Sequence, residues 1–180
     1  YFSVHATIIM ERGVAAEVKF AQKLASNEKK IRDRAIKRLN RYLSVRSRHA
    51  SGLSESDLLK IWKGLFYCMW MQDKPLIQEE LSQRITSLVH CFPKTEDALL
   101  FVKVFLETQS REWNGIDRLR LDKFLMMARE MMFQTLTLLS KAGWQESHCR
   151  TFALALYKNV MNAHEPRLPD GLKIHGRHLY

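Results

Sequence analysis

Apolar residues recur every three or four positions along most of the chain, which is the spacing of one face of an α-helix. Two stripes show this pattern most clearly. The first consists of Leu121, Phe124, Leu125, Ala128, Met131, Met132, Thr135 and Leu139. The second consists of Cys149, Phe152, Ala153, Leu156 and Val160. No segment reads convincingly as a strand, so the pattern predicts an all-α protein.

Glycines, prolines and capping residues separate the periodic segments. The best-defined helix start lies at Ser54, which forms the sequence of a capping box with Asp57. Asp117 is another candidate cap, because its carboxylate suits the positive end of a helix. The predicted helices span residues 14–25, 28–48, 55–72, 74–91, 96–112, 117–142 and 145–164.

Short links between these segments predict antiparallel helical hairpins. The starts near Ser54 and Thr95 are about one HEAT or armadillo repeat apart, so we expect about seven helices stacked as an α-solenoid. We divide the chain into an N-terminal appendage at 1–12, a solenoid-like domain at 13–165 and an irregular segment at 166–180. The last segment has two prolines, two glycines and no helical period.

The net charge of the chain indicates that this helical domain has an anionic partner. The chain of 180 residues holds 29 lysines and arginines against 19 acidic residues, a formal net charge of +10. Such an excess attracts phosphates over long distances, and nucleic acid is the usual partner. A membrane surface or an acidic protein is the alternative. No apolar run approaches the roughly 18 residues that span a bilayer, so we expect no membrane insertion.

A basic helix is the leading candidate for an RNA site. The segment 27–49 contains nine lysines and arginines, and a helical wheel places most of them opposite its apolar stripe. At about 1.5 Å per residue the face is roughly 27 Å long, enough to follow several phosphates. A solvated helix face is the alternative. The predicted RNA-binding residues are Lys30, Arg34, Lys37, Arg38, Arg41 and Arg48.

The opposite side of the same helix should face the core. We expect its apolar contacts to come from Ile31, Ala35, Leu39 and Tyr42. Arg32 and Arg46 fall on this inward side, where they should extend to the surface or pair with carboxylates of neighbouring helices.

Two further segments are candidate protein-binding surfaces. Apolar and aromatic residues surround most of the helix at 58–71, which is typical of a buried or bound helix. The segment 113–123 begins another helix, where Arg118 and Asp122 are spaced to pair. Core packing is the simpler interpretation of the aromatics. The predicted protein-binding residues are Trp62, Tyr67, Trp70, Arg120 and Lys123.

The sequence gives no sign of catalysis. It lacks a phosphate-binding loop, a nucleophile elbow and paired metal-ligand spacings. Adjacent histidine and cysteine side chains at 90–91 and 148–149 diverge on a helix, so neither pair makes a metal site. The three cysteines are far apart and odd in number, which favours a reducing compartment over a disulfide framework. We expect no enzyme, metal, cofactor or small-molecule substrate.

Three ungapped stretches carry a family resemblance. They read FAQKLASNEKKIRDRA at 20–35, LLKIWKGLFYCMWMQDKPLIQEEL at 58–81 and REWNGIDRLRLDKF at 111–124. Together they resemble the N-terminal domain of the ribosomal RNA processing protein 1 family, nucleolar proteins of the Nop52 type. The resemblance implies a protein of the nucleus and nucleolus that acts in pre-rRNA processing within large-subunit precursors, as a scaffold without catalytic activity.

Three functions therefore compete at this stage. The first is a scaffold that binds pre-rRNA and assembly factors of the large ribosomal subunit. The second is a protein-interaction solenoid that reaches pre-ribosomes only through partner proteins, without touching RNA. The third is an RNA-cleaving enzyme, which fits the basic charge but lacks any catalytic constellation.

Overall fold

The computed structural model describes residues 22–24, 26–49 and 52–177, and every regular element within them is helical. The prediction of an all-α fold is confirmed. The predicted appendage at 1–12 and most of the predicted helix at 14–25 lie outside the described residues. The α-helices are α3 (Lys29–Arg46), α4 (Glu55–Met71), α5 (Pro75–Thr86), α6 (Thr95–Glu112), α7 (Leu121–Lys141), α8 (Glu146–Leu156) and α9 (Asp170–Arg177).

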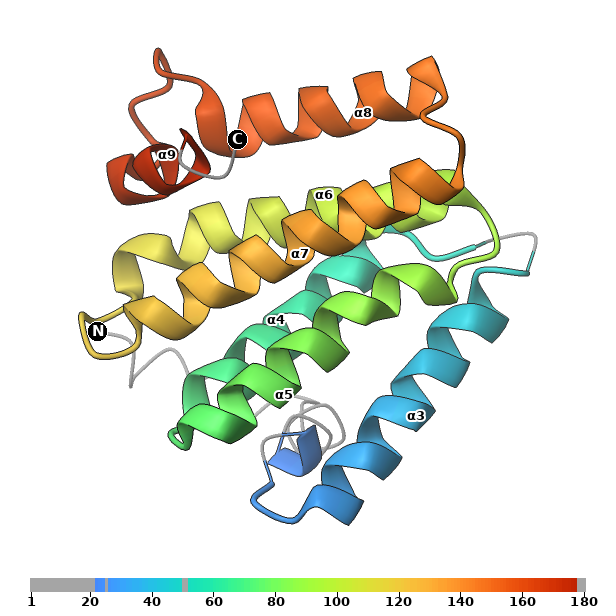
Figure 1. The fold of residues 1–180 in the computed structure, drawn as a ribbon, viewed down its shortest axis with the longest axis vertical. Helices are drawn as coiled ribbons and strands as arrows, with labels where there is room; N and C mark the ends of the chain where they lie inside the picture. The colour runs from blue at the N-terminus through green and yellow to red at the C-terminus, as the bar shows by residue number, and fades with distance from the viewer. Residues whose placement is uncertain (1–21, 25, 50–51, 178–180) are drawn as a thin grey trace.

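The helices form stacked antiparallel layers (Figure 1). In the stack, α4 packs on α6, α5 packs on α7, and α6 also packs on α8. The α3 helix lies at one end of this stack, and α8 and α9 lie at the other (Figure 1). This arrangement agrees with the predicted solenoid, because each layer contacts mainly its neighbours.

The core is built around aromatic side chains from successive layers. Phe66 of α4 stacks on Phe124 of α7, with ring centroids 4.5 Å apart. Trp62 of α4 packs against Phe101 of α6 at 4.6 Å and against Phe105 at 4.9 Å. Its indole Nε1 donates a hydrogen bond of 2.9 Å to the carbonyl oxygen of Phe101. These contacts fix α4 at the centre of the stack.

Local sequence signals placed one helix start correctly and another wrongly. The Ser54 capping box is confirmed, since the Asp57 amide donates to the Ser54 hydroxyl at 3.1 Å and the Ser54 amide donates to the Asp57 carboxylate at 3.2 Å. Asp117 does not cap α7, which begins at Leu121. Its carboxylate instead accepts hydrogen bonds from the amide and guanidinium of Arg120, closing a turn before the helix.

The C-terminal part of the chain is more helical than expected. The segment 166–180 was predicted to be irregular, but α9 occupies Asp170–Arg177. Leu168 and Leu172 are buried in the core region, so tertiary packing stabilises a helix that its two glycines disfavour. A Cβ atom at Gly171 would lie 3.1 Å from the indole nitrogen of Trp113. Any side chain at position 171 would therefore crowd the Trp113 ring, and glycine avoids this contact. The helix predicted at 145–164 ends at Leu156 and continues as a π-helical turn.

Candidate nucleic-acid interface

The six predicted RNA-binding side chains are all exposed. Five project from α3, and Arg48 lies in the turn that directly follows it. Within the described parts of the chain, none of the six side chains forms a hydrogen bond or an ion pair. Unpaired cations can take up phosphates without first giving up a protein partner. We call this set the basic face; it consists of Lys30, Arg34, Lys37, Arg38, Arg41 and Arg48.

The buried side of α3 lies opposite the basic face. It consists of Arg32, Ala35, Ile36, Leu39 and Leu43. The expectation that Tyr42 faces inward is wrong, because its side chain is 50% exposed. Ile36 and Leu43 are buried instead, which rotates the apolar stripe away from Tyr42. Tyr42 therefore belongs to the outer surface of the helix.

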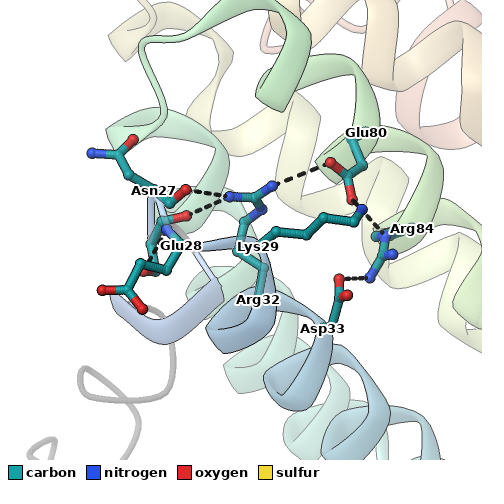
Figure 2. Close-up of polar contacts among 8 residues, drawn as sticks. Asn27, Glu28, Lys29, Arg32, Asp33, Glu80 and Arg84 are labelled. Atoms are coloured by element: carbon teal, nitrogen blue, oxygen red, sulfur yellow. Dashed lines mark hydrogen bonds and ion pairs between the residues drawn. The ribbon is translucent and has the colours of Figure 1, made fainter.

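An ion-pair network holds the inner side of α3 against α5 (Figure 2). Glu80 of α5 accepts hydrogen bonds from Lys29 at 2.6 Å and from Arg32 at 3.1 Å. The Arg32 guanidinium also donates to the carbonyl oxygens of Ser26 at 2.9 Å and Asn27 at 3.0 Å. The expected pairing of Arg32 with a carboxylate of a neighbouring helix is confirmed.

A second link in the network joins the same two helices. Arg84 of α5 pairs with Asp33 of α3, and its Nε lies 3.2 Å from Glu80 (Figure 2). The acidic group nearest the middle of α3 is therefore engaged on its inner side. Asp33 stands four residues before Lys37 of the basic face, and its pairing with Arg84 offsets the negative charge that would otherwise weaken the attraction for anions.

Glu80 should contribute stability in a pH-dependent way. Hydrogen bonds from Lys29 and Arg32 lower its pKa from the usual 4.5, against an opposing effect of burial. A carboxyl with a lowered folded pKa stabilises the protein above its unfolded pKa, and this contribution is lost as the pH falls through the folded value.

Replacing Glu80 with alanine should lower the free energy of unfolding at pH 7 by about 2 kcal/mol, because the nearly buried Arg32 loses its carboxylate partner. Urea unfolding measured from pH 7 to pH 3 checks this. The difference between wild type and Glu80→Ala should shrink below pH 4.5. A difference that stays constant with pH would show that the carboxylate charge is not responsible.

Trp62 is buried and is not part of the candidate protein-binding surface. Its side chain is 1% exposed, and its indole nitrogen is satisfied by Phe101. Tyr67 and Trp70 remain partly exposed on α4. Trp70 lies beside Phe66 and Phe124, and the Arg120 guanidinium lies 4.9 Å from its ring centroid. Of the three aromatic residues, only Tyr67 and Trp70 are accessible to a partner.

Lys123 is also buried and is not part of that surface. It is 5% exposed, and its Nζ donates to the carbonyl oxygens of Trp70 at 2.8 Å and Gln72 at 2.7 Å. Both carbonyls belong to the C-terminal end of α4, where a cation complements the helix dipole. Burial lowers the pKa of Lys123. Its role is to attach the start of α7 to the end of α4.

Several other polar groups among the described residues are buried or engaged with a partner. Burial raises the pKa of Cys91 to about 11, which makes its thiol a weak nucleophile. His148 pairs with Glu96 at 3.0 Å, and His90 contacts Gln134 at 2.8 Å. Within residues 22–24, 26–49 and 52–177, no group of three or more His, Cys, Asp or Glu side chains is placed to hold a metal ion. In the same residues no helix has the length and apolar character needed to cross a bilayer.

Glu80 and Tyr42 were missed by the sequence interpretation. Glu80 carried a usable signal, since it stands four residues before Arg84 on a helix and an inward-facing arginine on α3 requires a counter-ion. Tyr42 carried a misleading signal, because the helical wheel places it at the edge of the apolar stripe.

Comparison with known proteins points to one family. A family model described as the nucleolar protein Nop52 matches residues 15–180. The chain is 49% identical to ribosomal RNA processing protein 1 homolog B of Homo sapiens over 166 residues, 92% of this chain and 22% of that protein. It is 47% identical to homolog A of Homo sapiens, over 88% of this chain and 34% of that protein.

A relative with lower identity also matches most of this chain but only a small part of its own length. The homolog from Drosophila melanogaster is 37% identical over 150 residues, 83% of this chain and 22% of that protein. The chain therefore spans only about a fifth to a third of the length of these relatives.

Proposed function

The chain belongs to the Nop52 family of nucleolar proteins, and from this premise we propose that it acts in ribosomal RNA processing as a helical scaffold whose basic face binds pre-rRNA. The observation that carries the RNA contact is the basic face itself: six exposed cations on and beside one helix, unpaired within the described residues. Lys29 and Arg32 of α3 pair with Glu80 of α5, and these ion pairs hold α3 in place with its basic face turned outward.

The resemblance to this family supports the finer parts of the proposal. The relatives are named for ribosomal RNA processing, and the family is described as nucleolar, which supports work in the nucleolus. We assign the protein to precursors of the large subunit, with assembly factors as protein partners. We propose that the chain has no catalytic role; in the described residues His148 pairs with Glu96, and burial makes the Cys91 thiol a weak nucleophile.

The alternative is a protein-interaction module that reaches pre-ribosomes through partner proteins alone. One observation favours a protein surface at the end of the molecule where α4 meets α7. Leu119 is 93% exposed there, and it stands four residues before the buried Lys123. The exposed Met71 belongs to the same end, because Lys123 binds the carbonyls of the residues on either side of it. The exposed Leu76 lies close to Met71 in the sequence, at the start of α5. Tyr67, Trp70 and Arg120 remain our candidates for this contact.

These two functions differ in their response to Lys37→Glu combined with Arg41→Glu. Under the protein-only alternative, the chain gives no RNA crosslinks before or after the change, and association with pre-ribosomal particles survives. Under the proposed function, crosslinks are present in the wild type and decrease in the variant.

Salt dependence tests the proposed RNA contact in solution. Binding of the purified chain to a ribosomal RNA fragment should weaken steeply with salt, because each phosphate contact releases counter-ions. If all six cations contact phosphates, the logarithm of the association constant should fall with the logarithm of the salt concentration with a slope of about −4. Fluorescence anisotropy at several salt concentrations measures the slope. Binding that does not change with salt would refute the basic face as an RNA site.

A further inference from the structure

An aromatic side chain stands at the edge of the basic face. Tyr42 is 50% exposed on α3, and Val45 on the next turn is 49% exposed. Tyr42 follows Arg38 by four positions and Val45 follows Arg41 by four, so each apolar side chain neighbours a cation along the helix. The C-terminal half of α3 therefore presents apolar surface together with positive charge.

Within the described residues, no hydrogen bond or ring contact engages the Tyr42 side chain. Its own helix is nevertheless held firmly. Leu39 and Leu43, on either side of it in the sequence, are buried in the core. Glu80 ties the N-terminal half of α3 to α5 through Lys29 and Arg32 (Figure 2). The Tyr42 ring is therefore attached to a helix that is fixed in place, and one side of the ring is exposed to solvent.

This combination fits one class of nucleic acid better than another. Proteins that bind single strands combine a positively charged track for the backbone with aromatic rings on which unpaired bases stack. A base within an RNA duplex is already stacked on its neighbours and offers its face to no side chain. The basic face alone would serve either form, whereas an exposed ring beside it gains contact only with an unpaired base.

We propose that the basic face binds unpaired RNA, with Tyr42 stacking on a base and Arg38 and Arg41 contacting the adjoining phosphates. This inference rests on the proposed function and names its substrate class. It places the single-stranded contact on the C-terminal half of α3, while Lys30 and Arg34 extend the phosphate track toward the N-terminal end.

The test compares an oligouridylate with a blunt-ended RNA duplex that carries the same number of phosphates. The purified chain should bind the oligouridylate more tightly. Tyr42→Ala should weaken oligouridylate binding by about 5- to 150-fold, the range found when a stacking aromatic is removed, and should leave duplex binding unchanged. Tyr42→Phe keeps the ring and should bind like the wild type. Tyr157→Ala is the matched control, because Tyr157 is also 50% exposed but lies beyond α8.

Circular dichroism confirms that each variant is folded. Equal affinity of Tyr42→Ala and wild type for oligouridylate would overturn the inference, as would an equal loss in Tyr42→Phe or tighter binding of the duplex. In each of those results the chain still binds RNA, so the proposed function stands. Failure of the wild-type chain to bind either RNA would overturn both.

Discussion

Changing Lys30, Arg34, Lys37 and Arg41 together to glutamate should weaken RNA binding by about 10²- to 10³-fold at 0.1 M salt. Each phosphate contact of a single strand raises the affinity through counter-ion release by a factor of about 10^0.7 at this salt concentration, and four such contacts are lost. The four side chains are exposed and unpaired within the described residues, so the fold should survive. Binding isotherms by fluorescence anisotropy, with circular dichroism as the folding check, measure the effect.

A matched control separates the basic face from net charge. Reversal of four other cations changes the charge of the chain by the same amount, but at positions outside α3. This control should lower affinity by less than about tenfold, since charges away from the RNA act only through a screened field. Equal losses in the two variants would show that the overall charge of the chain, and not α3, attracts RNA. The control residues are the exposed Lys94, Arg129, Lys141 and Lys158.

Replacing Trp62 with alanine should lower the free energy of unfolding by about 3–5 kcal/mol, the usual cost of removing a large buried aromatic side chain. The ring contacts Phe101 and Phe105, and its nitrogen satisfies the carbonyl oxygen of Phe101. Trp62→Phe keeps most of the apolar contact and should cost about half as much. Urea unfolding followed by circular dichroism measures both variants.

The same experiment decides whether Trp62 is a core or an interface residue. A variant with alanine at position 62 that keeps wild-type stability and loses its protein partners would contradict the buried placement. Tyr67→Ala provides the comparison, because Tyr67 is only partly buried and should cost less stability. The two positions lie on the same helix, so helix propensity affects both in a similar way.

The helical fold could be predicted because its signals are local. Apolar spacing defined the helices, and the Ser54–Asp57 capping box fixed the start of α4. The basic face followed from the same periodicity, since residues opposite a buried stripe must face outward. Placing Arg32 on the inward side also required only the helical wheel, and its partner Glu80 is a carboxylate on the neighbouring α5 as expected.

The remaining errors arose where tertiary contacts decide. Lys123 looked like a surface charge, because nothing in its own segment shows that the carbonyls of Trp70 and Gln72 will lie beside it. Leu172 lacked a helical pattern around it, yet burial against the core supports α9. Tyr42 differs from the buried Leu43 by a single position in the sequence, and only the packing against neighbouring helices sets which of the two faces inward.

Residue-level mapping of RNA crosslinks in cells tests whether the basic face of α3 binds RNA. Ultraviolet crosslinking of the full-length protein, followed by mass spectrometry of the crosslinked peptides, identifies the side chains that touch RNA. We expect crosslinks to pre-rRNA on the peptides that cover α3, and loss of those crosslinks in the fourfold glutamate variant while the protein stays folded. Crosslinks confined to other helices, or unchanged in that variant, would contradict the claim that the basic face of α3 binds RNA.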